Sequence, residues 1–144
     1  MMNKKRVLIV DDQGELRKLV RMTLDFGDYE LHEAESGQRA LELAKVIQPD
    51  LIILDVMMPG EFDGYQVCEK LKQANSGKIP YVMLLTARGQ KTDLEEGTRV
   101  GADDYLIKPF SPLELIGNVN NALSSEVLKS GSYGILKVNS KVYR

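Results

Sequence analysis

The side chains best suited to chemistry in this sequence stand where apolar runs end. They are Asp11, Asp12, Asp55, Thr86 and Lys108. Taken singly, an aspartate in such a place is commonly a helix N-cap and a threonine is commonly a turn residue. If the runs are parallel strands, however, their carboxyl ends meet at one edge of a sheet, where such folds bind ligands. We therefore predict that the five side chains share one site.

Three carboxylates at one edge would repel one another. Each like-charged pair about 4 Å apart costs on the order of 4 kcal/mol at an effective dielectric constant of about 20, so the cluster calls for a cation. Oxygen ligands without a nearby histidine or thiol favour Mg²⁺ over Zn²⁺. A carboxylate beside Mg²⁺, a lysine and a hydroxyl is suited to attack phosphorus, and it would then carry the phosphoryl group as an acyl phosphate.

Five apolar runs that resemble strands alternate with five segments of helical spacing. The runs cover residues 5–10, 29–34, 51–54, 81–85 and 105–107. Ser36 is a predicted N-cap of the second helix, and Ser111, Pro112 and Glu114 form the start signal of the last helix. The alternation predicts an α/β fold, with a doubly wound five-stranded parallel sheet and helices on both faces.

Length and composition limit the class of protein. The chain has 144 residues and a formal net charge of −2, which fits one soluble domain without a general attraction to nucleic acid or anionic lipid. No apolar run approaches the roughly eighteen residues that a membrane span needs, and 7–10 is too short for a signal peptide. One cysteine, Cys68, fits a structural thiol in the cytoplasm. We expect one folded domain over 1–124 and a linker or tail over 125–144.

The same residues resemble the response-regulator receiver family, over roughly residues 5–124. The matching stretches are VLIVDD at 7–12, PDLIILDVMMPG at 49–60, LLTAR at 84–88 and GADDYLIKPF at 101–110. The resemblance implies a flavodoxin-like sheet with strand order 2-1-3-4-5. It also implies a phosphoprotein of a two-component system or phosphorelay, which undergoes autophosphorylation and autodephosphorylation without turnover of a conventional substrate.

The resemblance assigns roles to individual residues. Asp55 would accept a phosphoryl group from a sensor histidine kinase or a histidine phosphotransfer protein. Mg²⁺ would be held by Asp12, Asp55 and the main-chain carbonyl of Met57, with Asp11 in support. Thr86 and Lys108 would contact the phosphoryl group, and the Lys108-Pro109 bond would be cis. Tyr105 would be the aromatic switch, although aromatic residues near strand ends commonly pack in the core. The face of the fourth helix and fifth strand would carry the output and a possible homodimer.

The sequence departs from the family pattern in three places. The loop between Pro59 and Asp63 carries one residue more than usual, so Glu61 or Phe62 is expected to bulge beside the phosphorylation site and to change the phosphoryl lifetime. Gly14 in the first helical turn costs up to about 1 kcal/mol relative to alanine and is expected to loosen the kinase-docking surface. Met57 and Arg88 occupy the two positions that tune hydrolysis in the family.

Other functions remain open from the residues alone. A flavin- or nucleotide-binding module on the same fold would need a glycine-rich phosphate loop after the first strand, where this chain has Asp11 and Asp12. A phosphohydrolase with an aspartate nucleophile would usually carry that nucleophile after the first strand. His32 lies in the second run and is expected to be structural. The segment 125–144 is either the start of an output domain or a short extension.

Overall fold

The computed structural model describes residues 4–74, 77–87 and 91–124. The expectations for the segment 125–144 and for Arg88 fall outside these residues and stay predictions. Among the described helices, none has the length and apolar character needed to cross a bilayer.

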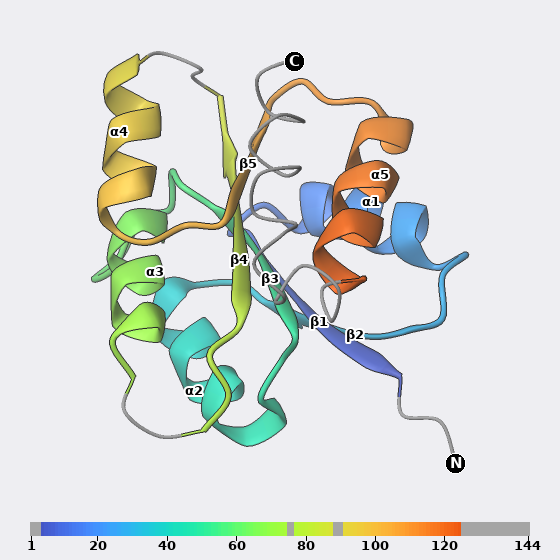
Figure 1. Cartoon of the computed structure of the whole chain (residues 1–144), viewed down its shortest axis with the longest axis horizontal. Coiled ribbons are helices and arrows are strands. Elements are labelled where there is room, and N and C mark those ends of the chain that lie inside the picture. The colour runs from blue at the N-terminus through green and yellow to red at the C-terminus, as the bar shows by residue number, and fades with distance from the viewer. Residues whose placement is uncertain (1–3, 75–76, 88–90, 125–144) are drawn as a thin grey trace.

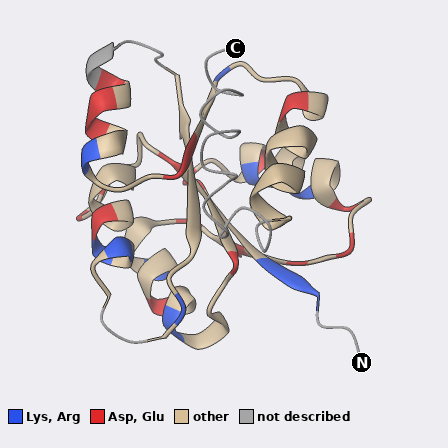
Figure 2. Cartoon of the chain, viewed as in Figure 1, with Lys and Arg blue, Asp and Glu red and all other residues tan. Residues whose placement is uncertain are grey.

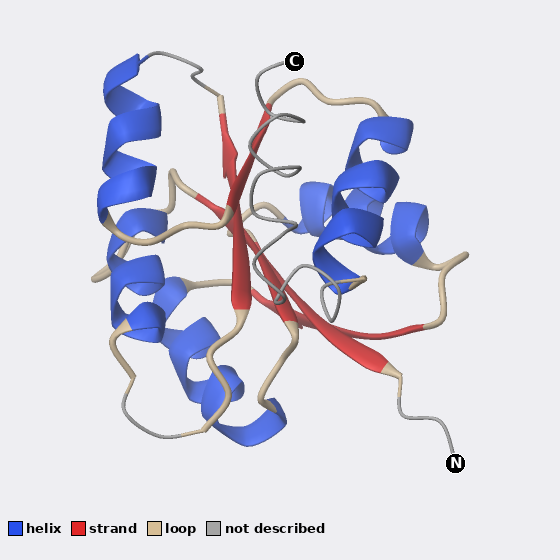
Figure 3. Ribbon diagram, in the orientation of Figure 1, coloured by secondary structure: helices blue, strands red, loops and turns tan. Residues whose placement is uncertain are grey.

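Five strands form one sheet. They are β1 (Lys5–Val10), β2 (Tyr29–Ala34), β3 (Leu51–Asp55), β4 (Tyr81–Thr86) and β5 (Asp104–Ile107). Their order is β2-β1-β3-β4-β5 and all four neighbouring pairs are parallel, which confirms the predicted topology. Every residue of the central strand β3 is buried, because helices cover both faces of the sheet (Figure 3).

Helices alternate with the strands along the chain. They are α1 (Gly14–Leu24), α2 (Gly37–Ile47), α3 (Gly64–Lys72), α4 (Lys91–Arg99) and α5 (Pro112–Leu123). Figure 1 shows α1 and α5 on one face of the sheet and α2, α3 and α4 on the other. The structure therefore has three layers. Because the strands are parallel, their carboxyl ends lie at one edge of the middle layer.

The core consists of two apolar clusters, one on each face of the sheet. Successive strand side chains point to opposite faces, so Ile52 and Leu54 of β3 enter one cluster while Leu51 and Ile53 enter the other. The first cluster includes side chains of α2 and α3, and the second includes side chains of α1 and α5. The continuous apolar run of β3 is thus explained by burial on both sides.

Local signals fix where the helices begin. Ser36 caps α2 and Ser111 forms a capping box at the start of α5, as predicted. Asp63 forms a second capping box at the start of α3, which was not predicted. Gln13 precedes α1 without a side-chain cap, and Gly14 is the first helical residue. The N-terminal turn of α1 is therefore the least locally stabilised of these four starts.

Charged residues of both signs are spread over the described part of the chain. Figure 2 shows Lys and Arg on β1 and on several helices, interspersed with Asp and Glu. This distribution agrees with the small net charge of −2.

Candidate functional site

The three predicted carboxylates meet at the carboxyl edge of the sheet. Asp55 is the last residue of β3, and Asp11 and Asp12 directly follow its neighbour β1. Each of the three offers a carboxylate oxygen, and these oxygens all lie within 4.8 Å of one another. The predicted convergence of the acidic residues is therefore confirmed.

Lys108 extends from the loop after β5 to the acidic cluster. Its Nζ lies 2.7 Å from Oδ1 of Asp55 and 3.9 Å from Oδ2 of Asp11. The Lys108-Pro109 peptide bond is cis, as the family resemblance implied. The backbone N–H of Lys108 also donates to the carbonyl of Thr86 at 2.8 Å, so the loop is tied to the end of β4.

Burial raises the free energy needed to ionise the carboxyl groups of Asp11 and Asp55. Asp11 is 1% exposed and Asp55 is 3% exposed. The pKa of Asp11 is raised to about 6, mostly by burial and in smaller part by the charges of Asp55 and Asp12, against the lowering effects of the Gln13 N–H and of Lys108. Burial also raises the pKa of Asp55, although its bond with Lys108 acts in the opposite direction. Lys108 therefore compensates only part of the charge in the cluster.

The donor set of the cluster fits a hard divalent cation. All three side chains supply oxygen, and Oδ2 of Asp11 is buried without a hydrogen-bond partner among the described residues. A cation at this place would stabilise the ionised carboxylate of Asp11, whose pKa is raised by burial and, to a smaller extent, by the charges of Asp55 and Asp12. Oxygen-only ligands favour Mg²⁺ over Zn²⁺.

Met57 contributes to the site through its backbone. Its N–H donates to the Asp55 carboxylate, which lowers the pKa of Asp55. The family resemblance implied a role for the carbonyl of Met57, and this bond of its N–H was not anticipated. A loop residue two positions after a strand-end carboxylate is placed to make such a turn contact. The side chain of Met57 is largely exposed.

The loop from Val56 to Asp63 is held close behind Asp55. A Cβ on Gly64 would lie 2.3 Å from the main-chain oxygen of Asp55, so only glycine allows α3 to approach this closely. The N–H of Gly64 donates to the carbonyl of Val56 at 3.0 Å. The start of α3 therefore holds the main chain of Asp55 and Val56 in place, and with it the Asp55 side chain.

In the loop for which an extra residue is predicted, Glu61 is exposed and Phe62 is partly buried. Phe62 packs against the apolar cluster shared by α2 and α3, and Nζ of Lys70 lies 4.9 Å from the centre of its ring. The main-chain oxygen of Phe62 also faces Gly37 at the start of α2. The loop is thus anchored on the helical layer through Phe62, and its effect on phosphoryl lifetime stays a prediction.

Thr86 lies at the same edge as the carboxylates. It is the last residue of β4, it is buried, and the register of β3 and β4 pairs Asp55 with Leu85, one residue earlier. Tyr105 of β5 instead lies against α4. A Cβ on Gly97 would be 2.4 Å from its ring, and its hydroxyl lies 2.6 Å from Oγ1 of Thr98. Both the switch role of Tyr105 and its packing role are compatible with this position.

Two other residues that carry reactive groups lie apart from the cluster. Cys68 is fully buried in α3, where burial raises its pKa to about 11, so the thiol is protonated at neutral pH. His32 lies in the edge strand β2, and its Nε2 is 2.7 Å from Glu30. These contacts agree with the structural roles expected for both residues.

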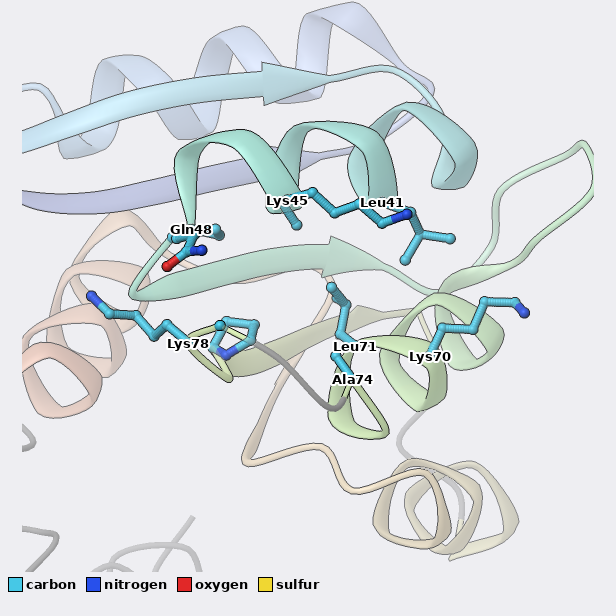
Figure 4. Close-up of a pocket in the computed structure, with 11 residues that line it drawn as sticks. Leu41, Lys45, Gln48, Lys70, Leu71, Ala74 and Lys78 are labelled. Atoms are coloured by element: carbon cyan, nitrogen blue, oxygen red, sulfur yellow. The ribbon is translucent and has the colours of Figure 1, made fainter.

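A cavity of about 290 Å³ lies between α2 and α3 (Figure 4). Pro49 and Pro80, which precede β3 and β4, line it, so it lies at the amino ends of the strands. Lys70 and Lys78 point in different directions in Figure 4, and Lys78 is bonded to Asp50. Because ligands of doubly wound sheets bind at the carboxyl ends, this cavity does not favour a flavin or nucleotide site.

Comparison with known proteins gives a consistent result. The family model described as the response regulator receiver domain matches residues 7–120. The probable transcriptional regulator ycf27 of Cyanophora paradoxa is 42% identical over 121 residues, which cover 84% of this chain and 49% of that protein. The transcriptional regulatory protein SrrA of Staphylococcus aureus is 44% identical over 117 residues, or 81% of this chain and 47% of that protein. The chain thus spans about half the length of these relatives.

Solved structures agree in fold and sequence. A putative response regulator from Chloroflexus aurantiacus has a TM-score of 0.78 and 37% identity, and the match covers 85% of this chain and 99% of that one. The chemotaxis response regulator CheY4 of Vibrio cholerae has a TM-score of 0.77 and 32% identity, covering 83% and 99%. With the family match over most of its length, the chain belongs to the response-regulator receiver domain family.

Proposed function

We propose that this receiver accepts a phosphoryl group on Asp55 in a Mg²⁺-dependent reaction. The donor is a phosphohistidine of a sensor histidine kinase or of a histidine phosphotransfer protein. The observation that supports the assignment most strongly is the placement of Asp55. It is a buried member of the carboxylate cluster at the end of the central strand β3, and its Oδ1 lies 2.7 Å from Nζ of Lys108.

The chemistry of the transfer follows from the side chains at this edge. A carboxylate oxygen of Asp55 forms a bond to phosphorus as the phosphorus–nitrogen bond of the donor breaks, and the imidazole nitrogen keeps the electron pair. Lys108 and the Thr86 hydroxyl contact the phosphoryl oxygens and offset their charge. Asp12, Asp55 and the carbonyl of Met57 would hold Mg²⁺, with Asp11 in support. The ion would neutralise further negative charge on the phosphoryl group.

Phosphorylation then shifts a conformational equilibrium. The charge at Asp55 changes from −1 to about −2, which draws Thr86 and Lys108 toward the phosphoryl group. Tyr105 responds to the movement of Thr86 and alters the face formed by α4 and β5. A shift from 1:99 to 99:1 requires about 5.5 kcal/mol, so a partner or a homodimer on this face would supply part of that energy.

The output and location are proposed by likeness to the family. Both curated relatives described above are named as transcriptional regulators, so we propose control of transcription as the response. The receiver itself contacts neither nucleic acid nor membrane in this proposal, and it acts in the cytoplasm.

The assignment is tested by phosphorylation with a small donor. Acetyl phosphate or phosphoramidate with Mg²⁺ should add one phosphoryl group, seen as a mass gain of about 80 Da by intact-protein mass spectrometry. Asp55→Asn should abolish the gain, and chelation of Mg²⁺ should prevent it in the wild type. Asp28→Asn is a matched control, because Asp28 is exposed and pairs only with Lys4 at 3.7 Å in the described structure. Labelling of the Asp55→Asn variant, or labelling that ignores chelation, would contradict the proposal.

A further inference from the structure

The guanidinium of Arg17 lies directly behind the acidic turn. From α1, its Nη1 donates to the main-chain carbonyl of Asp11 at 2.6 Å. Its Nε donates to Oε1 of Glu33 in β2 at 3.1 Å. The other oxygen of Glu33 accepts from Nη1 of Arg21 at 3.0 Å. Arg17 therefore joins the turn that carries Asp11 and Asp12 to the neighbouring strand.

The carbonyl that Arg17 binds lies in the peptide unit that leads to Asp12. The preceding N–H of Asp11 donates to Ala34 at 3.2 Å, and the N–H of Gln13 donates to Oδ1 of Asp11 at 2.8 Å. For the exposed carboxylate of Asp12, by contrast, no hydrogen bond is found with the described residues. Among the described residues, only the main chain therefore positions the Asp12 side chain, and the bond from Arg17 holds the peptide unit next to it.

We propose that Arg17 is a positioning residue for the Mg²⁺ ligand Asp12. The inference rests on the proposed function, in which Asp12 binds the ion. Arg17 acts through geometry rather than charge, because its guanidinium donates to Glu33 and to a main-chain carbonyl and to none of the carboxylates of the cluster. The charges that shift the pKa of Asp11 are those of Asp55, Lys108 and Asp12, while Arg17 meets only the main chain of Asp11. Arginine suits this place because its planar group serves two acceptors at once.

The test measures Mg²⁺ binding directly. We titrate Mg²⁺ into the wild type, Arg17→Ala, Arg17→Lys and Arg21→Ala, and follow backbone amide signals near Asp12 by NMR. Loss of an outer contact to a metal ligand typically weakens binding by tenfold or more, so the dissociation constant of Arg17→Ala should rise about tenfold. Arg17→Lys retains one donor and should lie between Arg17→Ala and the wild type.

Arg21→Ala is the matched control. It removes the other contact to Glu33 but leaves the bond to the Asp11 carbonyl, so its Mg²⁺ affinity should stay within about twofold of the wild type. Labelling of Asp55 at saturating Mg²⁺ should be equal in all four proteins, because Arg17 does not touch the reacting atoms. Thermal unfolding identifies any variant that does not fold, and if Arg17→Ala fails to fold, Arg17→Lys decides the question.

The outcomes separate this inference from the proposed function. Unchanged Mg²⁺ affinity in a folded Arg17 variant overturns the positioning role, and so does an equal loss of affinity in Arg21→Ala. Wild type that binds Mg²⁺ at this turn but takes up no phosphoryl group would instead contradict the proposed function and leave the role of Arg17 supported by the titration.

Discussion

Asp11→Asn should make the metal-free protein more stable, although most substitutions of buried residues do the opposite. Asp11 is 1% exposed, and its Oδ2 has no hydrogen-bond partner among the described residues. Asparagine has nearly the same shape and can still accept the N–H of Gln13 that lies 2.8 Å from Oδ1. The substitution therefore removes a buried charge and retains the contact that orders the turn.

The magnitude follows from the pKa of Asp11, which burial raises from 3.8 to about 6. Between pH 3.8 and about pH 6, the Asp11 carboxyl group binds its proton more tightly in the folded protein than in the unfolded chain. The free energy of unfolding therefore falls as pH rises through this window, and the loss is complete above about pH 6. A rise in pKa of this size corresponds to about 3 kcal/mol at most. Because the new amide nitrogen replaces Oδ2 without a partner, we expect a net gain of about 1–2 kcal/mol.

The assay is urea unfolding with chelator present at about pH 8 and about pH 5. At the higher pH, the Asp11→Asn variant should unfold at a higher urea concentration than the wild type. At the lower pH, Asp11 is largely protonated in the folded state, so the difference should shrink. With excess Mg²⁺ at the higher pH, the wild type should gain more stability than the variant, since a bound ion stabilises the folded state that holds it.

Asp28→Asn is the control for loss of one negative charge, because that residue is exposed. Its unfolding midpoint should change little at either pH. If the Asp11→Asn variant unfolds at lower urea than the wild type at about pH 8, the buried charge does not destabilise the site and the reasoning is wrong. A gain of the same size at both pH values would show that relief of charge is not its cause.

Three further substitutions test how the surrounding structure holds the site. Gly64→Ala places a Cβ 2.3 Å from the main-chain oxygen of Asp55, so urea unfolding should show a loss of about 1–3 kcal/mol, and an unchanged midpoint would contradict the close approach. Gly97→Ala places a Cβ 2.4 Å from the ring of Tyr105, so the ring should move away from α4. The fluorine NMR signal of a fluorotyrosine at position 105 should then shift and sharpen, and an unaltered spectrum would contradict that contact. Ser111→Ala removes the cap of α5 and should cost about 1 kcal/mol in the same unfolding assay, while Ser111→Asp should retain most of the stability.

The carboxyl-edge site was predictable because it depends on where strands end. Apolar runs mark the strands, and in a parallel sheet their ends meet whatever the loops do. Asp55 and Asp11 were placed together on that ground alone, and the structure confirms it. Lys108 was expected at the same edge because it follows the fifth apolar run, and its Nζ does bond to Oδ1 of Asp55 at 2.7 Å.

Contacts that depend on helix rotation and strand register were not predictable. Arg17 and Glu33 are 16 residues apart, and they meet only because α1 presents Arg17 toward β2. The position of Phe62 against α2 and α3 likewise depends on the path of the loop before α3, which has no periodic pattern. The capping box of Asp63 was different, since an aspartate followed three residues later by glutamine is a local signal. It could have been found from the sequence.

Two aspartates at opposite edges of the sheet have pKa values that shift in opposite directions. At the amino edge, Asp50 accepts bonds from Nζ of Lys78 and from the N–H of Arg6, and these hold its pKa below the usual value although burial acts to raise it. At the carboxyl edge, Asp11 keeps one oxygen without a hydrogen-bond partner among the described residues, and its pKa rises to about 6. The aspartate that only supports the fold therefore has hydrogen-bond partners, whereas Asp11 beside Asp55 has an oxygen that lacks one. Departures from full satisfaction of buried polar groups concentrate at functional sites, because a ligand supplies the missing partner. Under the proposed function, the missing hydrogen bond at Asp11 is the physical basis for Mg²⁺ binding at this edge, and Asp11→Asn should therefore raise stability and weaken Mg²⁺ binding together.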